Sequence, residues 1–209
     1  MKRLFEPQIK TIGVLDSFYD EETIKNETML FQADIEFCEK NSVIAREIVK
    51  QIPSKFDLDK YVIDTRVSML MPGYYPSIPG WHCDNFPRRN DNGQPDLESG
   101  DDAHHIMCLI GTSEGVSNTE FVVDKVDYEL DENDVWSSLH KQIEINKPKT
   151  SFVRNNEIIE FNQNAIHRSS PAKVRGWRLF FRLSKCGLKP KNEIRRQTQV
   201  YLLSDNGGW

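Results

Sequence analysis

The short segment PGWHCDNFP, residues 79–87, places a histidine and an aspartate two positions apart in surroundings that otherwise suit a core. Side chains at positions i and i+2 of a strand share a face, so His82 and Asp84 can point at one spot while Cys83 points away. One imidazole and one carboxylate make half of a metal site. An isolated pair of this kind is more often a simple hydrogen-bonded pair, so a metal site requires further ligands elsewhere in the chain.

A third ligand has to come from a distant strand, and His167 is well placed to supply it. It follows the apolar segment IIEF and precedes Pro171, which marks a turn or a sheet edge. The adjacent pair His104 and His105 is expected to be structural or to face the substrate, and His140 is expected at the solvated surface. Two histidines and one carboxylate on one face of an octahedral ion leave positions open, as in non-haem Fe(II) oxygenases.

An oxygenase of this kind usually needs a dicarboxylate cosubstrate, and the dicarboxylate needs a buried cation. Arg178 follows His167 by eleven residues. A hairpin whose turn centres on Ala172 and Lys173 would set these two residues opposite each other across a ladder. We therefore expect Arg178 to reach the pocket beside the metal.

Strand alternation places Arg178 and Arg182 on one face of the segment RGWRLFFRLS and apolar side chains on the other. Two inward arginines are costly unless anions pair with them. A planar guanidinium suits a bidentate carboxylate better than lysine does. For Arg182, an internal salt bridge is an equally good interpretation.

Composition limits the class of protein. The 209 residues fit one domain, and a net charge of -5 with 28% charged residues gives no general attraction to nucleic-acid backbones. No apolar run is long enough for a signal peptide or a membrane span, so a cytoplasmic location is expected. The four cysteines form no CxxC pair and are expected to be free thiols.

Periodicity predicts three regions in a single domain, residues 1–209. Residues 1–60 are expected to be helical, with Ser42 capping a helix that buries Val43, Ile44, Ile48 and Ile52. Residues 61–185 contain many short β-branched and aromatic runs, typical of a sandwich or jelly roll, interrupted by a long polar loop at 88–103 and an amphipathic helix at 131–143. Residues 186–209 form an extension without a functional interpretation.

The segments WHCD, AIHRSSP and RGWRLFFRLS together resemble the Fe(II)/2-oxoglutarate-dependent dioxygenase superfamily, in which an HxD pair is followed by a distant histidine and an arginine. The resemblance covers roughly residues 61–184. It implies a mainly β fold with flanking helices, in which a double-stranded β-helix, a cupin-like jelly roll, follows N-terminal helices. It also implies that His82, Asp84 and His167 bind Fe(II), and that Arg178 pairs with the distal carboxylate of 2-oxoglutarate.

Two further cosubstrate contacts are implied by the resemblance. Arg182 is similar to the second arginine of the taurine-dioxygenase type, which contacts the carboxylate near the metal. Thr119, in the segment VSNTEF, resembles a threonine in the GGxTxF segment of those enzymes, although both glycines are missing here.

The implied activity is oxidation by Fe(II), 2-oxoglutarate and O2, with hydroxylation of a small metabolite, an amino acid or a protein side chain and release of succinate and CO2. The loop at 88–103 and the helix near Trp136 are candidate lids. No interleaved basic and aromatic groove supports a nucleic-acid substrate. Two alternatives stay open: a non-catalytic jelly-roll module that holds a structural ion, and a zinc hydrolase that uses the same ligands.

Overall fold

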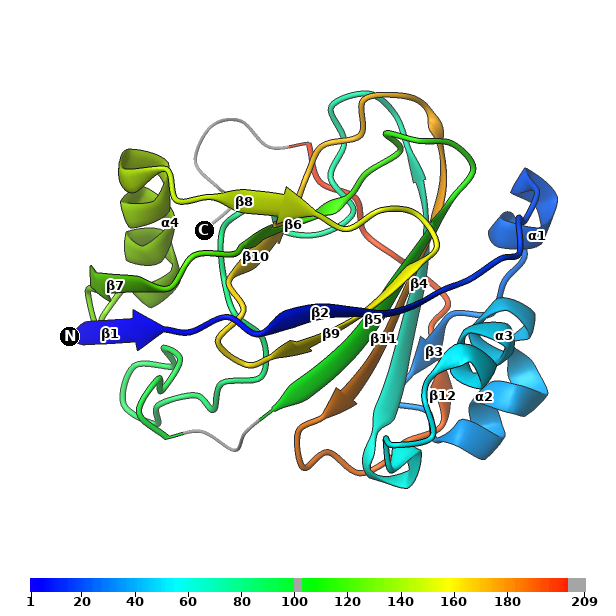
Figure 1. Cartoon of the computed structure of the whole chain (residues 1–209), viewed down its shortest axis with the longest axis horizontal. Helices are drawn as coiled ribbons and strands as arrows, with labels where there is room; N and C mark the ends of the chain where they lie inside the picture. The colour runs from blue at the N-terminus through cyan, green and yellow to red at the C-terminus, as the bar shows by residue number, and fades with distance from the viewer. Residues whose placement is uncertain (100–102, 203–209) are drawn as a thin grey trace.

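Antiparallel sheets form the frame of the protein in a computed structural model that describes residues 1–99 and 103–202 (Figure 1). The larger sheet has the strand order β2 (Ile9–Val14), β9 (Glu157–Asn162), β5 (His104–Gly111), β11 (Gly176–Lys185) and β4 (Val62–Leu70). A second sheet has the order β10 (His167–Ser169), β6 (Thr119–Val122) and β8 (Thr150–Phe152). Two short pairs join β1 (Lys2–Phe5) to β7 (Val126–Glu129) and β12 (Glu193–Ile194) to β3 (Leu30–Phe31). The fold is therefore mainly β with a few helices.

Strand β11 separates the apolar core from the polar interior of the molecule. Leu179, Phe181 and Leu183 are completely buried in the largest hydrophobic cluster. Arg178 and Arg182 alternate with them and line a cavity on the opposite face. The alternation predicted for this segment is confirmed, because successive side chains of a strand point to opposite faces.

Three helices cover the outer face of the larger sheet near β4: α1 (Glu21–Lys25), α2 (Ile35–Asn41) and α3 (Val43–Gln51) (Figure 1). Ser42 caps α3 as expected, since its hydroxyl accepts a hydrogen bond from the Ala45 amide at 3.1 Å. Ile44 and Ile48 are buried, but Val43 is 54% exposed. At the first helical position Val43 lies off the buried stripe, which corrects that part of the predicted face. A short 3-10 turn, Leu58–Lys60, leads from this region into β4.

The amphipathic helix expected at 131–143 is present as α4 (Val135–Asn146), and the four residues at the predicted spacing are buried: Val135, Trp136, Leu139 and Ile143. They pack in a cluster with Trp81 and Cys83, on the side of the molecule away from the other helices (Figure 1). Trp81 is only 1% exposed, as expected of a core residue. Helix α4 thus packs against the outward-facing side of the segment that carries His82 and Asp84 and holds that segment in place.

The prediction that residues 1–60 are helical is wrong for their first part. Strands β1 and β2 precede every helix, and β3 lies between α1 and α2. Strand β2 pairs with β9, which lies far away in the sequence. The local sequence pattern predicted the capped helix at Ser42. The short KRLF and IKTIGV segments become strands because distant partner strands satisfy their backbone hydrogen bonds.

The hairpin predicted around Ala172 and Lys173 is also wrong. Strand β10 pairs with β6, whereas β11 pairs with β4 and β5 in the other sheet. The connecting backbone is bound elsewhere: the Ala172 amide donates to the Tyr74 carbonyl at 2.9 Å and the Lys173 amide to the Gly115 carbonyl at 2.8 Å. These bonds replace a tight turn, so His167 and Arg178 approach the interior from two different sheets.

The predicted long loop at 88–103 carries no named helix or strand in its described residues, with one isolated bridge between Arg88 and Pro95. Residues 100–102 of that loop and 203–209 of the extension lie outside the described residues. All four cysteines are free, as expected. Over the ranges 1–99 and 103–202, no helix combines the length and apolar character that crossing a membrane would require.

Candidate metal centre

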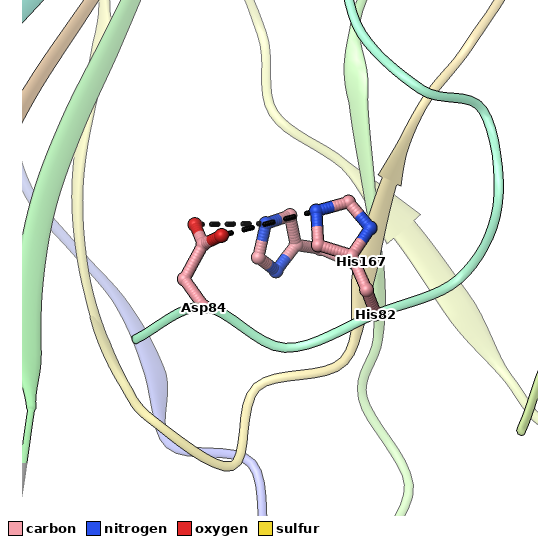
Figure 2. Close-up of side chains that lie close together, drawn as sticks. All are labelled: His82, Asp84 and His167. Carbon is pink, nitrogen blue, oxygen red and sulfur yellow. Dashed lines mark ion pairs between the residues drawn. The ribbon is translucent and has the colours of Figure 1, made fainter. Parts of the chain in front are cut away.

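His82, Asp84 and His167 converge at one point inside the molecule (Figure 2). Each offers one ligand atom, and these atoms all lie within 4.8 Å of one another. The carboxylate oxygens of Asp84 lie 3.3 Å from Nε2 of His167 and 3.9 Å from Nε2 of His82. Two imidazole nitrogens and a carboxylate oxygen at these separations are a donor set suited to a divalent transition metal.

The HxD segment is not part of a regular strand, contrary to the prediction. It is an extended loop that meets β10 in a single antiparallel bridge between His82 and His167. The two residues exchange both backbone hydrogen bonds, at 2.9 and 3.0 Å. Immediately after Asp84, Asn85 adopts a left-handed conformation with φ of 61° and turns the chain away. The bridge therefore supplies the alignment that a longer strand was expected to provide.

Backbone carbonyls fix the orientation of both imidazoles. Nδ1 of His82 donates to the Gly80 carbonyl at 2.8 Å, and Nδ1 of His167 donates to the Ala165 carbonyl at 2.9 Å. A carbonyl only accepts, so Nδ1 carries a proton in both rings, and the neutral form of each ring would keep its lone pair on Nε2. Hydrogen bonds of this kind commonly orient histidine ligands of metals. Both Nε2 atoms face Asp84, where an ion would be bound.

The electrostatic environment sets the protonation states that a metal needs. Burial, reinforced by the charge of His167, lowers the pKa of His82 to about 4. Burial alone would raise the pKa of Asp84, but the nearby charges of Arg182 and His167 outweigh it and hold that pKa well below its usual range. Near neutral pH, His82 is neutral and Asp84 is ionised. An ion could therefore bind these two groups without displacing protons from them.

Arg182 contacts the metal-ligand set directly. Its guanidinium Nη1 donates to Oδ2 of Asp84, and both side chains are about four-fifths buried, with exposed fractions of 22% and 20%. The internal salt bridge that was one interpretation of Arg182 is thus present. The same contact places Arg182 at the edge of the proposed ion site, where it could also meet a ligand of the ion.

Arg178 lies deeper and has no acidic partner among the described residues. It is 5% exposed, its Nη2 donates to the Thr119 hydroxyl at 3.5 Å, and its Nε has no hydrogen-bond partner. Burial, with a contribution from the charge of Arg66, lowers its pKa to about 9. A buried guanidinium without a carboxylate is costly, by several kcal/mol in typical proteins. Such a site favours an anionic ligand.

Thr119 comes from β6 and lies opposite Ser169 of β10. It is 5% exposed and lines the same cavity as the three candidate ligands. The structure therefore brings all six predicted site residues into one cavity of about 500 Å³, a size typical of small-molecule sites. A second cavity of about 660 Å³ lies on the outer side of β10, but Arg168 in its wall is already paired with Glu120 and Glu144.

Three half-buried charged residues in the cavity wall were not singled out by the sequence: Asp64, Arg66 and Arg195. The first two alternate with the buried residues Ile63, Thr65 and Val67 on β4, and such alternation could have marked them. Alternation alone does not indicate which face of a strand lines a site. Arg195 belongs to the C-terminal extension, which passes over this cavity and joins the Tyr75 backbone through Tyr201.

The remaining histidines stay out of the ligand set. His104 contacts the Tyr61 hydroxyl at 3.0 Å, and fully buried His105 contacts the Ser184 hydroxyl at 3.0 Å. Both are structural, one of the two interpretations considered for them. His140 is half-buried rather than fully solvated, because α4 presses it against the backbone of Trp81.

Neither a scan against protein-family models nor a search of curated proteins finds a match for this chain.

Proposed function

We propose that this protein is a non-haem Fe(II)- and 2-oxoglutarate-dependent oxygenase. The observation that carries the proposal is Arg178: a buried guanidinium without an acidic partner among the described residues faces the same cavity as a His, Asp, His ligand set. A metal site alone would suit several chemistries. The unpaired cation adds a requirement for an anion, which a dicarboxylate cosubstrate meets.

The residues present fit both groups. His82, Asp84 and His167 would hold the ion through Nε2, a carboxylate oxygen and Nε2. Three protein ligands leave other positions on an octahedral ion open. Arg178 would bind the distal carboxylate, with the Thr119 hydroxyl beside it, and Arg182 would lie near the ion through its contact with Asp84. When bound, Fe(II) and 2-oxoglutarate activate O2 to oxidise a substrate C–H bond, with release of succinate and CO2.

The protein's own contribution to this chemistry is positioning and exclusion of water. The carbonyls of Gly80 and Ala165 keep both imidazoles aimed at the ion site. Phe121 and Phe161 pack against the ring of His167, with centroids at 5.2 and 5.7 Å, and Phe161 also lines the cavity. A cosubstrate held between Arg178 and the ion would be fixed at both ends, which favours one orientation.

The sheet arrangement supports a double-stranded β-helix as the finer description of the fold. The larger and the smaller antiparallel sheets share one interior cluster, to which β5, β9 and β6 contribute Met107, Leu109, Ile159, Phe161 and Phe121. In the proposed fold the ligands project into the space between the two sheets. A zinc hydrolase could use the same three ligands, but it would give no role to Arg178.

The test is an anaerobic titration of the protein with Fe(II) and 2-oxoglutarate, following the weak visible charge-transfer band of the chelate. We expect the band in the parent and in Arg175→Ala, which removes an exposed arginine just before β11. Arg178→Ala should keep the iron and lose most of the 2-oxoglutarate affinity. Absence of the band from the iron-loaded parent, or an unchanged affinity in Arg178→Ala, would refute the proposal.

A further inference from the structure

Arg66 is a second cation in the cavity, and its guanidinium forms no ion pair with a described residue. It lies half-buried on β4, and its side chain makes no hydrogen bond or ion pair with any residue in the ranges 1–99 and 103–202. Its charged neighbours, Arg182 and Arg195, are paired with Asp84 and Asp64. Burial and the charges of Arg195 and Arg182 lower the pKa of Arg66, and the opposing effect of Asp64 does not outweigh them, so the environment of Arg66 disfavours its charge. An anion would relieve this cost.

The register of the larger sheet places Arg66 beside the cosubstrate site. Arg66 lies directly opposite Phe180 of β11 in the antiparallel ladder. Diagonal neighbours in such a ladder are about 7–8 Å apart, so Arg66 is flanked on the same face by Arg178 and Arg182. An anion bound to Arg66 would therefore lie next to Arg178 and Arg182, the residues proposed to contact 2-oxoglutarate. The side chain of Arg182 would separate this anion from Asp84.

Charge balance shows that 2-oxoglutarate does not use up the positive charge. Among the described residues, the cavity wall holds four buried or half-buried arginines and two aspartates: Arg66, Arg178, Arg182, Arg195, Asp64 and Asp84. These four arginines exceed the two carboxylates by two charges, and the exposed Arg88 of the same wall would add a third. A divalent ion and a dianionic cosubstrate cancel each other, so the excess remains when both are bound. The excess positive charge of the cavity wall would therefore attract a further anion.

The C-terminal extension completes this part of the wall. Strand β12 pairs with β3 and fixes Arg195, whose guanidinium lies 4.1 Å over the Phe31 ring and 3.5 Å from Asp64. Beyond it, Tyr201 exchanges two backbone hydrogen bonds with Tyr75, both at 2.8 Å. The extension, which had no functional interpretation from sequence, therefore places a second guanidinium beside Arg66.

We propose that the substrate of this site is a small acid whose oxyanion group is bound by Arg66, with Arg195 beside it. The inference rests on the proposed oxygenase function and adds a substrate class to it. A planar guanidinium binds a carboxylate through two parallel hydrogen bonds, which also fixes the direction of the substrate. The cavity of about 500 Å³ must hold 2-oxoglutarate as well, so the acid is a small molecule.

The experiment is a calorimetric titration under anaerobic conditions of the full chain, loaded with Fe(II) and saturated with 2-oxoglutarate. The probes are L-amino acids and short carboxylic acids, each with its primary amide, and alkyl sulfonates and phosphates of matched length. We expect one oxyanion class to bind, its neutral counterpart to fail, and Arg66→Gln to weaken binding at least about tenfold. Arg66→Lys should lose less, because it keeps the charge without the planar fork.

Arg89→Gln is the matched control, because Arg89 pairs with Glu132 at 3.1 Å outside the cavity. It should bind the acid like the parent. Equal binding of acid and amide, equal binding by parent and Arg66→Gln, or no binding of any probe to the parent would overturn the inference.

The chelate band separates this result from the proposed function. Arg66→Gln should keep the band, since Arg66 contacts none of the candidate ion ligands. If the parent lacked the band, the oxygenase proposal would fail, and the same probes would be titrated into the protein without 2-oxoglutarate. Weaker probe binding by Arg66→Gln than by the parent would still decide whether Arg66 forms an anion site.

Discussion

His82 and His167 are hydrogen-bonded to each other through both of their backbone amides, although they lie far apart in the sequence. Their rings follow this pairing, with centroids 4.7 Å apart and both Nε2 atoms directed at Asp84. The candidate metal centre is thus built on a single backbone bridge between a loop and β10. The backbone pairing that forms this bridge therefore also brings the candidate metal ligands together.

Asp84→Asn should weaken metal binding more than loss of an outer hydrogen-bond partner does, which typically costs about 10- to 100-fold. The substitution removes the only carboxylate of the ligand set and leaves Arg182 without its partner. Competition with a fluorescent chelator measures the affinity. Asp91→Asn, in the exposed loop, is the control and should bind the ion normally. Equal affinities of the two variants would exclude Asp84 as a ligand.

Arg178→Met should stabilise the protein in the absence of ligand, by about 1 kcal/mol or more, because it removes a buried charge without an acidic partner. The parent should gain about 2.7 kcal/mol when 2-oxoglutarate is present at a hundred times its dissociation constant, and the variant should gain nothing. Urea denaturation of the metal-loaded protein, with and without 2-oxoglutarate, measures both effects. A destabilised variant that still responds to 2-oxoglutarate would mean that Arg178 is purely structural.

Stability should fall in mild acid because His105 is buried and neutral. Burial lowers its pKa in the folded protein to about 3, from about 6.5 in the unfolded chain. Between these values the unfolded chain binds one more proton, so this histidine lowers the free energy of unfolding by about 1.4 kcal/mol for each pH unit of acidification. The loss of stability caused by His105 is therefore absent above the pKa of the unfolded chain and grows progressively as the pH falls below it.

The measurement is urea denaturation of the metal-free protein between pH 6.5 and 4. His105→Gln should show a shallower dependence on pH than the parent, whatever its absolute stability. Acidic groups such as Asp84 act in the same direction, but they are common to both proteins. Parallel pH profiles would show that His105 does not titrate as proposed.

Phe121→Ala should weaken both stability and metal binding. Phe121 is 1% exposed and packs against the rings of His167 and Phe161. Its truncation should cost about 3–5 kcal/mol and leave the His167 ring free to turn. Phe5→Ala removes an equally buried ring from a different cluster, so it should lose similar stability and keep the metal affinity. Equal affinities of these two variants would show that Phe121 does not position His167.

The sequence by itself determined the local features of this protein. The alternation in RGWRLFFRLS fixed which side chains of β11 face the core, the cap at Ser42 fixed the start of α3, and apolar spacing located α4. The types and order of His82, Asp84, His167 and Arg178 were sufficient to suggest a metal site with an anion beside it. The alternation, the cap and the apolar spacing each depend on neighbouring residues, so a linear pattern can reveal them.

Tertiary structure decided everything that depends on distant pairing. Residues 2–5 and 9–14 became strands because distant partners satisfy their backbones, and the predicted hairpin was replaced by strands in two sheets. The same is true of Arg66 and Arg195, which share one cavity wall only because β4 pairs with β11 and the C-terminal extension returns to β3. Backbone hydrogen bonds between remote segments carry no local sequence signal, and they determine which polar side chains meet.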